Sequence, residues 1–200
     1  MLTVDLEKVF QDFKAMKHFN AGEGITEENI EIWHQIRKNA NEKYAILFSQ
    51  PHLKDLTREE FVSFLYYRNN RSWTKLYRRG LEAASKIGDL KKAIAYLQYE
   101  DIDIRVRINS VLRGGGYYVR GIGKNIATGI LFVCDQEDKY GLWNNRTEGG
   151  LEKIGRLPRK TYNNGEFYFR INSELNRLKR QLNTDLIMID MFMWYIDKFR

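Results

Sequence analysis

The stretch Gly121-Ile122-Gly123-Lys124-Asn125-Ile126-Ala127, followed by the apolar run 128–134, decides how this sequence is interpreted. Its two glycines permit a tight backbone turn and leave room for a ligand to approach the main chain. The residues after the second glycine predict a new helix, whose first N–H groups have no partner inside the helix. Such a helix start can bind a phosphate group. The sequence therefore predicts a phosphate-binding turn, with a simple connection between helices as the alternative.

Charge is unevenly distributed along the 200 residues, which carry a net charge of +7. Residues 1–60 contain 8 basic and 11 acidic side chains, whereas residues 61–200 contain 25 basic and 15 acidic ones. The basic surplus thus lies in the part of the chain that contains the glycine turn. This asymmetry favours a protein that binds a polyanion such as nucleic acid. The alternative is a soluble protein that is generally rich in lysine.

Composition limits the class of protein further. Hydrophobic residues make up 43% of the chain, which is enough for a core. No apolar run reaches the roughly 18 residues of a transmembrane helix, and the first ten residues lack the features of a secretory signal. The single cysteine, Cys134, excludes an internal disulfide framework and a cysteine-ligated cluster. We expect a cytoplasmic protein without membrane contact, metal or cofactor, and leave open a monovalent cation at the glycine turn.

Apolar residues recur mostly at helical spacing, and no stretch alternates as a strand would. The sequence therefore predicts an all-α fold, one multi-helix globular domain over residues 1–200. Within it, residues 1–55 would form an N-terminal helical annex and residues 56–200 the core that contains the glycine turn. Pro51 should end the second helix near Phe48, and Thr57 with Glu60 fits a capping box.

Local signals give the boundaries of the other elements. We expect Thr26 to cap the second helix, Trp73 to lie in a helix that Gly88 closes, and Asp89 to cap the helix after it. Further helices are expected at residues 4–18, 101–112, 124–134, 146–154, 171–182 and 185–199, with loops at 135–139 and 155–168.

The pattern hydrophobic-x-Gly-hydrophobic-Gly-x-x-x-Ala at residues 119–127 resembles the hairpin of helix-hairpin-helix proteins. An apolar helix, a short loop and the segment Tyr140-Gly141-Leu142-Trp143-Asn144-Asn145-Arg146 follow it. This order resembles the core of the helix-hairpin-helix DNA glycosylase superfamily over about residues 100–155. The resemblance implies a glycosylase-like helical fold, DNA as the partner and a role in DNA repair.

The catalytic pair of that family is not kept at the matching positions. Bifunctional members carry a lysine nucleophile two residues after the second glycine, where this sequence has Asn125. Lys124 is rotated from that direction by about 100° around the helix, so it is predicted to contact phosphate. The family's aspartate falls near Asn144 or Asn145, and an amide carries no charge and is no base. The resemblance therefore implies DNA binding more strongly than base excision.

Candidate site residues follow from the turn and the resemblance. Backbone amides at Gly121, Gly123 and Asn125 are predicted to bind phosphate, with help from Lys124, Arg120 and Arg113.

A second set lies after the apolar helix. Trp143 is predicted either to stack on an extruded base or to be buried, while Asn144, Asn145 and Arg146 are possible base contacts.

Three carboxylates also need an explanation. Asp135 and Asp138, in the loop before Trp143, are either displaced catalytic acids or parts of a solvated loop. Asp190 stands between Ile189 and Met191 in the last, very apolar helix, and we expect it to pair with an arginine.

Three functions remain open from the sequence. The first is a helix-hairpin-helix protein that binds duplex or damaged DNA through its phosphates. The second is an active DNA base-excision glycosylase that uses Asp135 or Asp138. The third is a protein-interaction adaptor that binds an acidic partner and no nucleic acid.

Overall fold

A computed structural model describes residues 5–112 and 114–200. Its fold is all-α, as predicted, with one short β-hairpin. None of the helices in this part of the chain is both long and apolar enough to cross a membrane. The elements are α1 (Leu6–Lys14), β1 (Lys17–Gly22), β2 (Ile25–Asn29), α2 (Ile30–Phe48), α3 (Gln50–Leu53), α4 (Arg58–Phe64), α5 (Tyr67–Asn70), α6 (Tyr77–Ala84), α7 (Ile87–Leu97), α8 (Ile104–Val111), α9 (Lys124–Cys134), α10 (Asn145–Lys153), α11 (Asn164–Gln181) and α12 (Leu186–Phe199).

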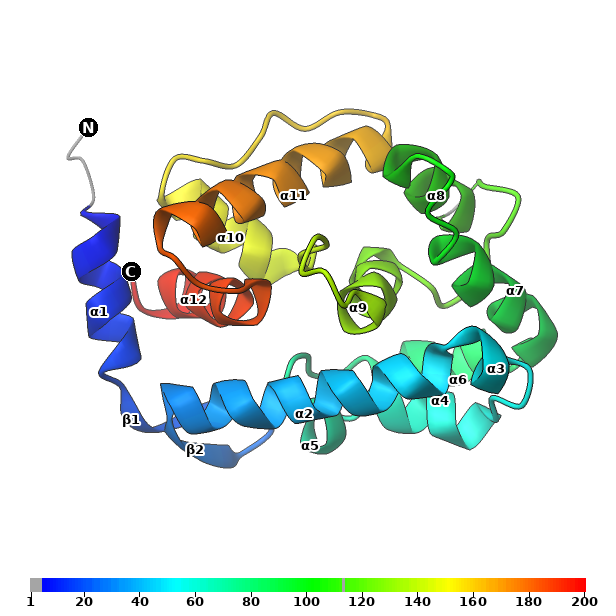
Figure 1. The fold of residues 1–200 in the computed structure, drawn as a ribbon, viewed down its shortest axis with the longest axis horizontal. Helices are drawn as coiled ribbons and strands as arrows, with labels where there is room; N and C mark the ends of the chain where they lie inside the picture. Colours follow the sequence, from blue (N-terminus) through cyan, green and yellow to red (C-terminus); the bar gives the residue numbers. More distant parts are fainter. Residues whose placement is uncertain (1–4, 113) are drawn as a thin grey trace.

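Two apolar helices, α9 and α12, form the centre of the molecule. In Figure 1 they lie between α2, which runs the length of one side, and α11 on the other side. Every residue from Ile126 to Val133 in α9 is buried, and so are Met188 to Ile196 in α12. A helix that is hydrophobic on all sides needs neighbours on all sides, which explains their central position.

The N-terminal segment packs against the C-terminal helix. Phe10 and Phe13 of α1 contact Phe192 of α12 with ring centroids 5.1 and 5.5 Å apart. The prediction that the chain contains no strand is wrong here, because β1 and β2 form an antiparallel hairpin that turns at Glu23 and Gly24. These strands are short, and a mostly polar two-stranded hairpin gives little alternation to detect.

The hairpin also changes the start of α2. Thr26 lies in β2, so the prediction that it caps the helix is wrong. Asn29 is the N-cap instead, and its Oδ1 accepts a hydrogen bond from the Ile32 amide at 2.8 Å. The end of α2 at Phe48 is confirmed, as is the capping box in which Thr57 and Glu60 bond reciprocally.

Three other predicted boundaries are wrong. Trp73 lies in irregular chain before α6 and is buried against Phe64, with ring centroids 4.9 Å apart. Asp89 and Gly88 lie inside α7, which begins at Ile87. Helix α11 begins at Asn164, within the expected loop, because the Asn163 side chain caps it by accepting from the Glu166 amide. Tertiary burial therefore decides the position of Trp73, whereas the start of α11 depends on a local cap at Asn163 that was missed.

The glycine turn packs against α6 and not against α8, the helix that precedes it in the chain. Helix α8 packs on α7 and α11, and residues 112–123 connect it to α9. Gly121 has φ +98°, and a Cβ there would lie 2.5 Å from the Arg79 carbonyl oxygen and 2.7 Å from the Ala83 nitrogen. Only glycine fits this position.

This packing predicts that the two glycines of the turn differ in tolerance. Gly121→Ala should lower the free energy of unfolding by about 1–3 kcal/mol or more, because it combines backbone strain with a steric clash. Gly123→Ala should cost less than about 1 kcal/mol, because φ is −113° and no atom lies within 4 Å of a Cβ there. Urea unfolding of both variants measures the difference, and equal losses would contradict this account of the turn.

Candidate functional site

The N-terminus of α9 presents free backbone amides. Ile126 and Ala127 donate to the Gly123 carbonyl at 3.1 and 3.0 Å, and these are the first hydrogen bonds of the helix. Within the described residues, the amides of Gly123, Lys124 and Asn125 donate to no backbone acceptor. Because Gly123 has no side chain, it leaves the helix end uncovered. An anion can therefore approach three N–H groups and the positive end of the helix dipole.

A surface groove of about 320 Å³ lies in front of this helix end. We call it the turn groove, and its walls are formed by Leu76, Arg79, Tyr118 and residues 121–126. Arg79 and Arg120 both pair with Glu82, and the Arg120 side chain is 81% exposed. Exposed ion pairs contribute little free energy, so these guanidinium groups can exchange Glu82 for another anion. Arg113, the other predicted phosphate contact, lies outside the described residues.

Lys124 contacts α10 in the structure. Its ammonium group pairs with Glu148 and lies 5.4 Å from the ring centroid of Trp143. Burial raises the pKa of Glu148, but hydrogen bonds from Lys124 and from Trp143 Nε1 outweigh that effect and the pKa is lowered overall. Glu148 therefore remains ionised and holds Lys124 beside the turn groove. No feature of the sequence indicated this pairing.

A cavity of about 170 Å³ lies on the other side of Asn125. We call it the asparagine cavity. The structure brings together here the predicted residues Asn125, Asn144, Asn145 and Arg146. A cavity of about 150 Å³ can hold one benzene molecule, so this space has the scale of a single planar ring. The remaining wall residues are Ala21, Trp33, Arg37, Ser72, Trp73, Thr74, Asp190 and Trp194.

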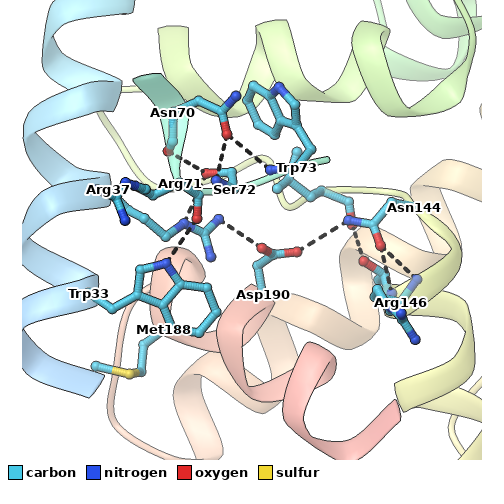
Figure 2. Close-up of polar contacts among 12 residues, drawn as sticks. Trp33, Arg37, Asn70, Arg71, Ser72, Trp73, Asn144, Arg146, Met188 and Asp190 are labelled. Atoms are coloured by element: carbon cyan, nitrogen blue, oxygen red, sulfur yellow. Dashed lines mark hydrogen bonds and ion pairs between the residues drawn. The ribbon is translucent and has the colours of Figure 1, made fainter. Parts of the chain in front are cut away.

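A buried ion pair forms part of the wall of the asparagine cavity (Figure 2). Arg37 Nη2 donates to Asp190 Oδ2 at 2.7 Å, and the two side chains are 1% and 8% exposed. Arg37 Nε also donates to Ser72 Oγ at 2.9 Å. The prediction that Asp190 pairs with an arginine is confirmed. The position of Asp190 at this cavity was not predicted. The only sequence signal for Asp190 was a single carboxylate in an apolar helix, which does not indicate a cavity.

Asn144 links the cavity to the start of α10. Its Oδ1 accepts from the amides of Arg146 and Thr147 at 2.8 and 2.9 Å, as an N-cap does. Its Nδ2 lies 3.4 Å from Asp190 Oδ1 (Figure 2). The Asn125 side chain is half-buried and makes no hydrogen bond within the described residues. Asp190 Oδ1, which has only the long contact with Asn144 in the described part of the chain, and the Asn125 amide thus have capacity for a further hydrogen bond to a ligand.

Trp143, predicted either to stack on a base or to be buried, is buried, and the aromatic walls of the cavity come from other tryptophans. Trp143 is 4% exposed and packs against Phe167 and Tyr168, with centroids 5.5 and 6.1 Å away, and it does not line the cavity. Trp33 and Trp194 meet edge to face at 5.2 Å and do line it. The sequence contains no local signal for this, because the two residues lie in helices at opposite ends of the chain.

Asp135 and Asp138 lie elsewhere. Asp135 accepts from the backbone amides of Glu137 and Tyr140 at 3.0 and 2.6 Å, while Asp138 accepts from the Leu186 amide and pairs with Lys179, each at 3.0 Å. Burial raises the pKa of Asp135, and its amide hydrogen bonds oppose that rise. Both carboxylates line a separate space beside α2, and neither lines the asparagine cavity.

Comparisons with known proteins give one solved structure. No protein-family model matches the sequence, and no curated protein matches it. The chain is similar to an 8-oxoguanine glycosylase/lyase of Methanocaldococcus jannaschii, solved in complex with a 15mer DNA that contains 8-oxoguanine. The two are 18% identical, the alignment covers 98% of this chain and 90% of that one, and the TM-score is 0.43.

The ion pair at the cavity predicts a characteristic mutational pattern. Asp190→Asn should lower the free energy of unfolding by about 3–5 kcal/mol, because it leaves the buried charge of Arg37 without its counter-ion. The double variant Arg37→Met with Asp190→Leu should recover most of that loss, since it removes both buried charges. Chemical denaturation of the two variants tests this. If the double variant is as unstable as the single one, the charges are not the cause.

Proposed function

We propose that this chain binds DNA, with a backbone phosphate in the turn groove and one unpaired or extruded base in the asparagine cavity. The observation that carries the proposal is the position of Asn125, which lines both spaces. Its backbone amide is one of the three free N–H groups, and its side chain borders the cavity. A phosphate bound in the turn groove and a base bound in the asparagine cavity would therefore be neighbours, as they are in a nucleotide.

The chemistry of the cavity supports a nucleobase as its occupant. Three indole side chains, Trp33, Trp73 and Trp194, border the cavity with less than 10% of each residue exposed, and an aromatic wall of this kind is suited to a planar base. Asp190 Oδ1 can accept from a ring or amino N–H, and the Asn125 amide can both donate and accept. The cavity has the scale of one ring, which agrees with a single base and with no longer stretch of nucleic acid.

The glycine at the helix start gives a direct test of the phosphate contact. Gly123→Leu should raise the Kd for a duplex DNA by about tenfold or more, because the side chain covers the amides. Gly123→Ala should leave the Kd within about twofold, since a methyl group is small and accepts no hydrogen bond from these amides. Fluorescence anisotropy at two salt concentrations measures both, and binding should weaken with salt.

The matched control is Gly88→Leu, because a Cβ at Gly88 also meets no atom within 4 Å. Gly88 lies in α7 and lines neither the turn groove nor the asparagine cavity. Equal DNA affinity of Gly123→Leu and the wild type would contradict the proposed phosphate contact.

A second candidate function, base excision, is favoured by the carboxylate of Asp190 in the cavity. Asn125 supplies no amine nucleophile, so the reaction would be hydrolytic. A water oxygen would bond to C1′ of the sugar as the C1′–N bond breaks. One proton of that water would be transferred to the nitrogen of the departing base. Asp190 would stabilise the positive charge that develops on the sugar. This role replaces the one considered for Asp135 and Asp138.

Incubation with duplexes that each contain a different damaged base tests this second function. An active enzyme should leave an abasic site in at least one duplex. The double variant Arg37→Met with Asp190→Leu, which also lacks the carboxylate but is expected to keep most of the stability, should lower the rate by about 100-fold or more while DNA binding through the turn groove persists. Circular dichroism at the assay temperature shows that the variant remains folded. Tight DNA binding by the wild type without any abasic product would exclude excision of those bases and leave the binding proposal standing.

A further inference from the structure

A space of about 640 Å³ lies beside the C-terminal half of α2 and plays no part in the proposed DNA contacts. We call it the lateral groove. One wall consists of Lys38, Asn41, Glu42, Ala45, Ile46 and Ser49. These positions follow the spacing i, i+3, i+4, i+7, i+8 and i+11, so they form one continuous stripe of the helix. The stripe is three turns long, about 17 Å.

The lateral groove has apolar surface at its centre. Ala45 and Ile46 face a wall that includes Phe132, Val133 and Ile187. The Ile46 residue is 60% exposed, the largest exposure among the big aliphatic residues of the described part. A second hollow of about 500 Å³ adjoins it, and the two share Ile46 and His52, so these residues lie between the two hollows. Exposed apolar surface of this kind is typical of an interaction site.

The charge of the lateral groove is opposite to that of the chain as a whole. Its walls carry the carboxylates of Glu42, Asp135, Asp138 and Asp185 together with the ammonium group of Lys38 and the imidazole of His52. Two of these carboxylates have a partner outside the walls, since Asp138 pairs with Lys179 and Asp185 with His34. The chain overall has a net charge of +7. With Lys179 included, four carboxylates face two ammonium groups, so this surface is acidic and favours a cationic partner over nucleic acid. Glu42 is exposed and makes no hydrogen bond or ion pair within the described residues, so it is free to bind a partner.

We propose that the lateral groove binds a basic amphipathic helix of a partner protein. Apolar residues of that helix would pack against Ile46 and Ala45, as in other complexes in which a helix occupies a groove. Its lysine or arginine side chains would pair with Glu42, the carboxylate of these walls that makes no ion pair or hydrogen bond within the described residues. This site is independent of the DNA contacts, because none of its residues lines the turn groove or the asparagine cavity.

A labelled 14-residue peptide of leucine and lysine at helical spacing serves as the probe. Ile46→Glu and Glu42→Lys should each raise its Kd by about tenfold or more. The matched control is Val106→Glu in α8, a residue that is 49% exposed and outside the lateral groove, and it should leave the Kd within about twofold. A peptide with glutamate in place of lysine should bind at least about tenfold more weakly than the probe.

Three results would overturn the proposal. The first is equal affinity of the probe for Ile46→Glu and Val106→Glu, and the second is equal binding of the basic and acidic peptides. The third is a concentration-dependent dimer in sedimentation that Ile46→Glu abolishes, which would make a second copy of this chain the occupant. DNA binding measured on the same variants should be unchanged, so failure here is distinguishable from failure of the DNA-binding proposal.

Discussion

The buried ion pair between Arg37 and Asp190 joins parts of the chain that are otherwise separate. Arg37 belongs to α2, Asp190 to α12, and their hydrogen bonds extend to Ser72 and Asn144. Four segments are thereby fixed around the asparagine cavity. A buried pair of this kind adds little net stability compared with an apolar pair of the same volume, because both charges lose their hydration. Its effect is on geometry, since each of the four segments must be in place before all the polar groups are satisfied.

Signals within a few residues of one another were sufficient to predict much of the fold. The capping box at Thr57, the end of α2 at Phe48 and the helix after the glycine turn all depend on local hydrogen bonds and backbone preferences. The β-hairpin and the position of Trp73 depend on contacts with distant residues. Phe19, for example, packs on Trp33 and Trp194, and Glu27 bonds to Tyr67 and Arg71. No short window of sequence contains such information.

The candidate site divides in the same way. The residues at its centre, Asn125 and Asn144, were identified from the turn and the order of segments after it, and the structure brings them to one cavity. The carboxylate beside them was sought in Asp135 and Asp138, the acids nearest in sequence. It is instead Asp190, about fifty residues further along the chain from those acids. Proximity in sequence was a poor guide because α12 returns to the centre of the fold.

The central position of α12 has a consequence for how the chain folds. This helix contacts α1, α2, α10 and α11, so the first and last helices of the described chain depend on each other. Contacts of such high sequence separation carry a large loop-closure entropy and slow folding. Until residues 186–196 have left the ribosome, the apolar surfaces of the preceding helices have no cover. Transiently exposed apolar surface of this kind makes a partly folded chain prone to aggregation.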